Sequence, residues 1–207
     1  MRVRTFLSLL ALVSLSLLAG CSTAPDTEEG RENLHEEVNA ALNRFERADP
    51  ELKDFLDRSI GYAMFPSVGK AGFGLGAAYG QGEAFENGER IGSAAIRQGS
   101  LGLQAGAQEF DELVVFGTRE AMDKFKNEKL EFGANASAIV LKSGAAKAAS
   151  FRDGVAVFTD PKGGAMVELS ISGQQFTYRP LERERRTERT TERRETERRE
   201  TTEERHY

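Results

Sequence analysis

The chain has 207 residues, of which 39% are hydrophobic, with a formal net charge of −5 and one cysteine. One cysteine allows no internal disulfide and no metal site built from several thiolates. The acidic balance argues against nucleic acid as a partner, because nucleic acid attracts basic surfaces through its phosphates.

Residues 1–20 have the composition of a secretory signal peptide. Arginines at positions 2 and 4 precede an apolar run, residues 6–18, that is too short for a membrane-spanning helix. The following Leu18-Ala19-Gly20-Cys21 resembles a bacterial lipobox, in which the Cys21 sulfur takes a diacylglyceryl group and the new N-terminus is acylated again, for example by palmitate. Several acyl chains anchor a protein stably. The alternative is an ordinary secretory signal with an incidental cysteine.

Ser22 follows the cysteine where a retained lipoprotein would carry aspartate, and this resembles the pattern for outer-membrane sorting. We therefore expect a lipid-anchored protein of the outer membrane that faces the periplasm, although exposure at the cell surface remains open. Residues 21–30 are polar and acidic and are predicted to be a lipidated tether.

Two helices are expected next. Residues 31–48 place an apolar stripe on one helical face, formed by Leu34, Val38, Ala41, Leu42 and Phe45. Asp49-Pro50 then suits a helix start, with aspartate as the cap and proline in the first helical position. Because glutamates crowd the polar face of the first helix, core packing is favoured over insertion into a membrane.

The stretch from Ser59 to Gln108 is dominated by glycines that alternate with larger residues. Gly72, Gly74, Gly76, Gly80 and Gly82 share one parity. Because side chains alternate across a strand, this pattern predicts a central strand with one bare face, of the kind that another backbone or a ligand approaches closely. A nucleotide-binding loop is excluded, because neither a Gly-Lys-Ser/Thr end nor a following helix is present.

The remaining elements follow from turns and apolar alternation. Asn87-Gly88 predicts a tight hairpin turn, and Pro66 is expected to stop the strand that starts at Gly61. Thr118 suits the cap of a helix over residues 119–129. Further strands are expected at 90–97, 99–107, 112–116, 136–141, 155–159, 165–172 and 175–178. The fold class is therefore α+β, a mostly antiparallel glycine-rich sheet with N-terminal helices and one further helix packed on it.

The glycine-rich stretch also carries a family resemblance. Ser59-Ile60-Gly61-Tyr62-Ala63-Met64-Phe65-Pro66 and its continuation through Gly76 resemble the opening signature of the SYLF domain, and the likeness continues through 99–108, 109–137 and 162–169. It covers about residues 31–180. The resemblance implies lipid binding, which is known for the family. Some eukaryotic members also bind actin, a partner that a bacterial periplasm lacks.

Candidate binding residues are cations near the strands. Lys70 lies beside the glycine ladder, where it could hold a lipid phosphate while Gly72, Gly74 and Gly76 let backbone amides approach; Arg97 is a second candidate. The alternative for Lys70 is a solvated lysine at a strand end. Gln98, Gln104 and Gln108 could line a polar groove or pair with nearby backbone.

Catalysis, cofactors and metals are not expected. His35 in the first helix and His206 in the tail are the only histidines, and His35 is best explained as part of a solvated helix face. Glu109, Asp111 and Glu112 form a carboxylate cluster that fits a polar loop edge better than a glycosidase pair.

The tail, residues 181–207, holds nine arginines and nine glutamates and repeats Thr-Glu-Arg-Arg-Glu at 191–195 and 196–200. It has no apolar face to bury and is expected to be disordered. The sequence thus predicts a membrane-anchored, non-enzymatic protein that binds phospholipid. The alternative is a structural or protein-interaction module of the envelope that docks a partner on the glycine-lined face.

Overall fold

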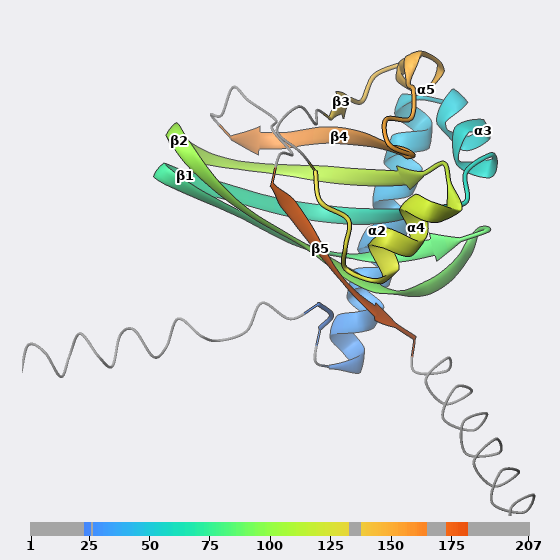
Figure 1. Ribbon diagram of the computed structural model, residues 1–207, viewed down its shortest axis with the longest axis horizontal. Helices are drawn as coiled ribbons and strands as arrows, with labels where there is room; N and C mark the ends of the chain where they lie inside the picture. Colours follow the sequence, from blue (N-terminus) through green and yellow to red (C-terminus); the bar gives the residue numbers. More distant parts are fainter. Residues whose placement is uncertain (1–22, 26, 133–137, 165–172, 182–207) are drawn as a thin grey trace, which may run out of the picture.

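The computed structural model describes residues 23–25, 27–132, 138–164 and 173–181. These residues form an α+β fold, as predicted, in which helices pack on a mostly antiparallel sheet (Figure 1). In chain order the elements are α2 (Glu28–Ala48), α3 (Glu51–Asp57), β1 (Gly61–Glu86), β2 (Glu89–Phe116), α4 (Arg119–Lys126), β3 (Ile139–Val140), α5 (Ala145–Ala148), β4 (Val155–Gly164) and β5 (Gln174–Pro180).

The centre of the fold is a long two-stranded ribbon made by β1 and β2. The strands pair antiparallel from Gly61 opposite Phe116 to Glu86 opposite Glu89. Asn87 and Gly88 form the predicted tight turn, with φ values of 51° and 79° that suit these residue types. The separate strands expected between residues 90 and 116 are one continuous strand. The prediction that Pro66 stops the first strand is wrong, because the chain passes it through a register shift between Phe65 and Val68, the kind of irregularity that admits proline.

The ribbon reverses on itself, so that two halves of β1 cross (Figure 1). We call residues 61–72 with 106–116 the upper half, and residues 76–86 with 89–99 the lower half. A Cβ on Gly82 would lie 2.1 Å from the Met64 carbonyl oxygen, and one on Gly80 would lie 2.9 Å from that of Ser67. The bare face predicted from the glycines is therefore confirmed here, and the backbone that approaches it is the other half of the same strand.

Strand β2 lies in the middle of the sheet. Its 108–116 segment pairs with β4 and its 92–98 segment pairs with β5, both antiparallel. Strand β3 pairs with β4 in parallel. In the described sheet β1 therefore lies at the edge, and the prediction that it is central is wrong. Of the other predicted strands, residues 165–172 and 136–137 lie outside the described part.

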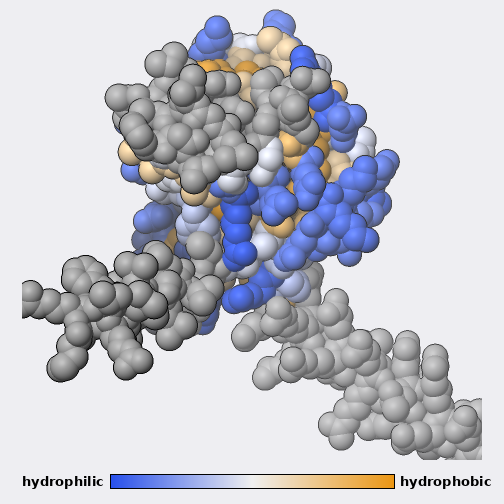
Figure 2. All heavy atoms as spheres, turned by 60° about the vertical axis from the view of Figure 1, so that its left-hand side comes forward, coloured by the Kyte–Doolittle hydropathy of each residue, from blue (hydrophilic) through white to orange (hydrophobic). Residues whose placement is uncertain are grey.

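Two apolar cores result. The inner core lies between the inward faces of the two halves and α4, and includes Phe65, Ile96, Phe116, Phe125 and Phe176. The outer core joins the opposite face of the strands to α2 and α3, and includes Val38, Phe45, Leu113 and Phe158. In the view of Figure 2, hydrophilic residues cover much of the coloured surface, and smaller apolar areas lie between them.

The helices begin at recognisable caps. The Thr27 hydroxyl accepts a hydrogen bond from the Gly30 amide, which starts α2 three residues earlier than predicted. The Thr118 hydroxyl caps α4 as predicted by accepting from the Ala121 amide. Helix α2 packs its apolar stripe on the sheet, in agreement with the preference for core packing. Within the described residues, no helix is long and apolar enough to span a bilayer.

The Asp49 carboxylate makes shorter hydrogen bonds to the backbone at the start of α5 than to that of α3. Its carboxylate accepts from the amides of Ala146 at 2.7 Å and Gly144 at 3.2 Å, and only at 3.3 Å from that of Glu51. Fully buried, it ties the end of α2 to α5.

The crossing of the two halves can be tested at its tightest point. We expect Gly82→Ala to lower the free energy of unfolding by at least about 2 kcal/mol, because the new methyl group would overlap the Met64 carbonyl. Gly69→Ala, in the same strand, meets no atom within 4 Å and should change stability by less than about 1 kcal/mol. Urea denaturation measures both; equal effects would contradict the crossing.

Candidate functional site

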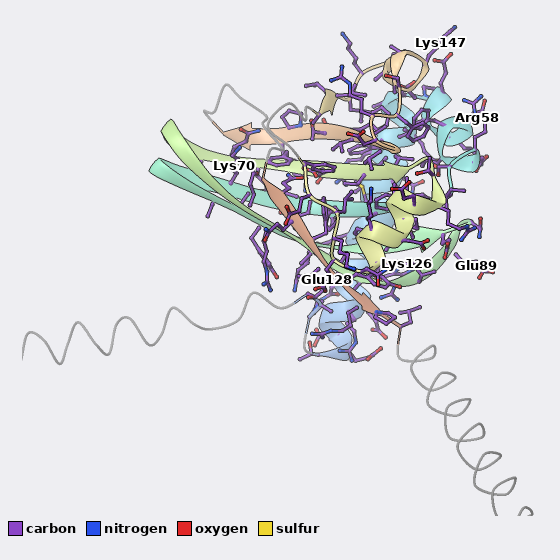
Figure 3. All side chains as sticks on the ribbon, viewed as in Figure 1. Arg58, Lys70, Glu89, Lys126, Glu128 and Lys147 are labelled. Atoms are coloured by element: carbon purple, nitrogen blue, oxygen red, sulfur yellow. The ribbon has the colours of Figure 1, made fainter. Side chains whose placement is uncertain are left out.

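Lys70 lies inside the fold. It is 3% exposed and faces the inner core from the upper half of β1, opposite Gln108 on β2. The alternative of a solvated strand-end lysine is therefore wrong. Figure 3 shows Lys70 toward the end of the sheet at which the ribbon reverses.

A cavity of about 580 Å³ opens beside Lys70. Both halves of β1 contribute to its wall, so it exists because the ribbon reverses. We call it the Lys70 cavity; it is lined by Ser67, Gly69, Lys70, Ala71, Ala77, Ala78, Tyr79, Ala107, Gln108, Glu109 and Lys162. Its charged lining residues are two lysines and one glutamate. Its size falls in the range of small-molecule sites, roughly 300–1,000 Å³.

Lys70 belongs to a group of buried polar side chains on the inward faces of the strands. We call this group the inner polar cluster; each member is at most 7% exposed, and the members are Lys70, Gln98, Gln108, Glu112, Thr159 and Gln174. Pairing explains why they meet, because Glu112 lies opposite Thr159 and Gln98 lies opposite Gln174. The Gln174 side-chain amide donates to Glu112 Oε2 at 3.0 Å.

Several atoms of the cluster have no hydrogen-bond partner among the described residues. They are Gln108 Oε1, Glu112 Oε1, Thr159 Oγ1 and Gln174 Oε1. Leaving such an atom unsatisfied in a protein interior costs roughly 1–3 kcal/mol. Buried polar groups are otherwise almost always satisfied, so these atoms mark a place that suits a polar ligand or water.

Glu112 is a titratable group whose pKa is changed by this setting. Burial raises the pKa of its carboxyl to about 7, while the hydrogen bond from Gln174 and the charge of Lys70 act in the opposite direction. The cluster can therefore change its charge near neutral pH.

The three carboxylates Glu109, Asp111 and Glu112 do not lie at the polar loop edge that the sequence predicted. They lie within β2, where Asp111 and Glu112 are fully buried and only Glu109 is exposed. Lys162 Nζ lies 2.9 Å from Asp111 Oδ1 and 3.6 Å from Glu109 Oε1. The Ser67 hydroxyl donates to Glu109 at 3.0 Å. These contacts connect β1, β2 and β4 beside the Lys70 cavity.

The other predicted site residues are not among those that line the Lys70 cavity. Gly72 pairs with Gly106 and Gly76 with Ser100 at the reversing end, with Gly74 between them in the chain. Arg97 is exposed and lines a second cavity of about 530 Å³ with Gln98 and Gln175. Lys70 and Arg97 therefore do not contact one cavity. Cys21 lies outside the described residues.

The side chain of His35 is 43% exposed, in partial agreement with its prediction as part of a solvated face, but it also contacts the sheet. Its Nδ1 lies 2.7 Å from Oε2 of the fully buried Glu83, whose other oxygen lies 2.6 Å from Arg90. Residue 35 thus joins α2 to the lower half. In the described residues no group of three or more metal-ligating side chains could hold a metal ion.

Some site residues escaped prediction. Gln98 and Gln108 line two different cavities and not one shared groove, and the side chain of Gln104 lies outside the described part. Glu112, Thr159 and Gln174 were not foreseen as partners. The available signal was the two-residue period of a strand. Glu112 lies two residues from Phe110 and two from Val114, so its side chain points to the same inward face.

The fold and this cavity define an α+β domain built on a reversed two-stranded ribbon with a buried polar cluster. Residues 97–186 match the family described as Ysc84, Las17-binding protein actin regulator, which is the SYLF domain. The match covers less than half of the chain, and the resemblance stated from the sequence is confirmed over this range. No curated protein is similar enough to the chain to count as a match.

The matched range begins in β2 and contains most of the inner polar cluster, but it does not include β1, Lys70 or the signature at 59–76. At the level of the family, SYLF domains are associated with lipid and protein interactions.

The titration of Glu112 predicts a pH dependence of stability. Its folded pKa of about 7 lies above its ordinary value of 4.5, so the folded state holds the proton more tightly. The stabilisation is complete below pH 4.5 and is lost as the pH rises through 7, a change of about 3 kcal/mol. Glu112→Gln should therefore gain about this much over the parent chain between pH 4.5 and 8, measured by urea denaturation.

The matched control is Glu89→Gln, which replaces an exposed glutamate of the same strand. Its pH profile should run parallel to that of the parent. A Glu112→Gln profile that also stays parallel would show that Glu112 does not titrate in this window.

Proposed function

We propose that this protein binds phospholipid through the Lys70 cavity and is anchored to the outer membrane, facing the periplasm, by acyl groups on Cys21. It acts by binding and not by catalysis. The single observation that carries the binding proposal is a buried lysine beside an open cavity, in a cluster with several unpartnered polar atoms.

The chemistry of the cavity suits an anionic headgroup. A lysine ammonium makes a charge-assisted hydrogen bond to a phosphate oxygen, and such bonds are stronger than neutral ones. Lys70 and Lys162 bring two positive charges to the cavity lining and Glu109 brings one negative charge. The lining therefore has a net positive charge, although the chain as a whole is acidic. The unpartnered side-chain oxygen of Gln108, which lines the cavity, accepts hydrogen bonds, so a headgroup with hydroxyl or amino groups would satisfy it.

Catalysis has little support in the described residues. Their one histidine, His35, lines a different cavity from Lys70 and is held against Glu83. The raised pKa of Glu112 is explained by the burial of its carboxyl group and does not require a catalytic role.

The alternative of a protein-docking module loses part of its proposed surface. At Gly80 and Gly82 the glycine-lined face is covered by the other half of β1, so no partner can reach it there. The family description names a Las17-binding protein and actin regulator. A protein partner of this chain would need a part of that face away from Gly80 and Gly82, or another surface.

Vesicle co-sedimentation tests the headgroup proposal. The mature chain from Ser22, without acyl groups, should pellet with vesicles that contain phosphatidylglycerol and stay in solution with phosphatidylcholine alone. Lys70→Gln should reduce pelleting at least about tenfold, because one lost charge-assisted bond of roughly 1.5–3 kcal/mol corresponds to that change. Lys147→Gln is the charge-matched control, since that side chain is 79% exposed at the other end of the domain.

Pelleting of the parent that Lys70→Gln leaves unchanged would contradict the Lys70 cavity as the site. A parent chain that pellets with no vesicle would contradict phospholipid binding. Circular dichroism of both variants confirms that each is folded.

The anchor has its own test. We expect Cys21→Ser to remove the acyl mass from the full-length protein and to release it from the membrane fraction into the soluble one. Mass spectrometry and fractionation measure both effects. Retention of the variant in the membrane would contradict anchoring through Cys21.

A further inference from the structure

The residues that follow Cys21 are packed against the domain. The hydroxyl oxygens of Thr23 and Thr177 lie 2.9 Å apart, which fixes the chain to β5. Ala24 is 3% exposed, and the Pro25 carbonyl accepts a hydrogen bond from Arg31 in the first turns of α2. Within the described residues a contact with the domain thus occurs two residues after the proposed anchor, whereas the sequence predicted a tether of ten residues.

This spacing limits how far the domain can move from a bilayer. Two extended residues reach about 7 Å. We propose that the end of the domain formed by the start of α2 and the end of β5 lies directly on the membrane surface and holds the domain in one orientation. The inference rests on the acylation of Cys21 in the proposed function, and is independent of the Lys70 cavity.

The same end carries a second chain exit and a cavity. Ala24 and Leu181 both line a cavity of about 510 Å³, together with Arg31, His35, Arg90 and Arg179. The fully buried Glu83 fixes His35 and Arg90 in its wall. Figure 1 shows the start of α2 and the end of β5 at one end of the molecule.

The occupant of this face is the bilayer to which the anchor belongs. Guanidinium groups match phosphate geometry, so the three arginines suit a layer of lipid headgroups. Glu28, Glu32 and Glu36 line the same cavity and balance the arginines in charge. The orientation therefore comes from the short connection and the packed Ala24, not from bulk attraction to anionic lipid.

The opposite end of α2 supplies the reference point. Its 21 residues span about 30 Å. Asp49, directly after the helix, holds α5 through the Ala146 amide. Lys147 in α5 therefore lies about one helix length from the proposed membrane face.

Depth-dependent fluorescence quenching tests the orientation. The acylated Cys21 is the only cysteine of the chain, so Glu32→Cys or Lys147→Cys in the full-length protein takes a thiol-reactive fluorophore at one place. The protein is reconstituted in vesicles of phosphatidylethanolamine and phosphatidylglycerol with a headgroup nitroxide lipid. The label at position 32 should lose most of its fluorescence, and the label at 147 should lose almost none.

A length variant supplies the matched control. Ten Gly/Ser residues inserted between Ser22 and Thr23 give a flexible reach of about 16–19 Å and should abolish most of the quenching at position 32. Equal quenching at the two positions, stronger quenching at 147, or no effect of the insertion would overturn the orientation. If the parent itself lacks acyl mass and stays out of the membrane fraction, the proposed anchor fails and the orientation fails with it. A protein that is membrane-bound but equally quenched at both positions refutes the orientation alone.

Discussion

The close crossing of the two halves of β1 is the constraint on which the rest of this structure depends. At Gly82 the neighbouring backbone carbonyl lies where any other residue would place its Cβ. Because the halves can approach this closely, one long ribbon encloses an inner core and still presents an outer face to α2. The glycine pattern is thus first a requirement of the fold. It contributes to a site only indirectly, by creating the space beside Lys70.

The inner polar cluster is unusual for the interior of a small domain. Apolar residues fill the inner core near α4, whereas the side toward the reversal holds a lysine, a glutamate, a threonine and three glutamines. Unsatisfied groups of this kind oppose folding. A cluster that weakens the fold fits a binding role, since a ligand supplying the missing bonds would recover that free energy.

Local signals in the sequence predicted local structure well. Asn87-Gly88 predicted the turn, Thr118 the helix cap, and the glycine parity the bare face. Alternation shows which residues share a face, but it does not show whether that face is inside. A solvated Lys70 therefore stayed an alternative to a binding role, and Glu112 looked like part of a loop edge, although both face the inner core. The passage of β1 through Pro66 could not be predicted, because a bulge depends on the partner strand.

Helix α2 connects the residues that follow Cys21 to both halves of the ribbon. It reaches the lower half through His35 and Glu83, and the upper half through Arg44 and Asp111 at 2.6 Å. Both carboxylates are fully buried, so their partners cannot leave without a large cost in desolvated charge. The helix therefore fixes the crossing that forms the Lys70 cavity, and its first turns hold the chain next to Cys21. An orientation set by the proposed anchor would therefore reach the cavity through this one helix.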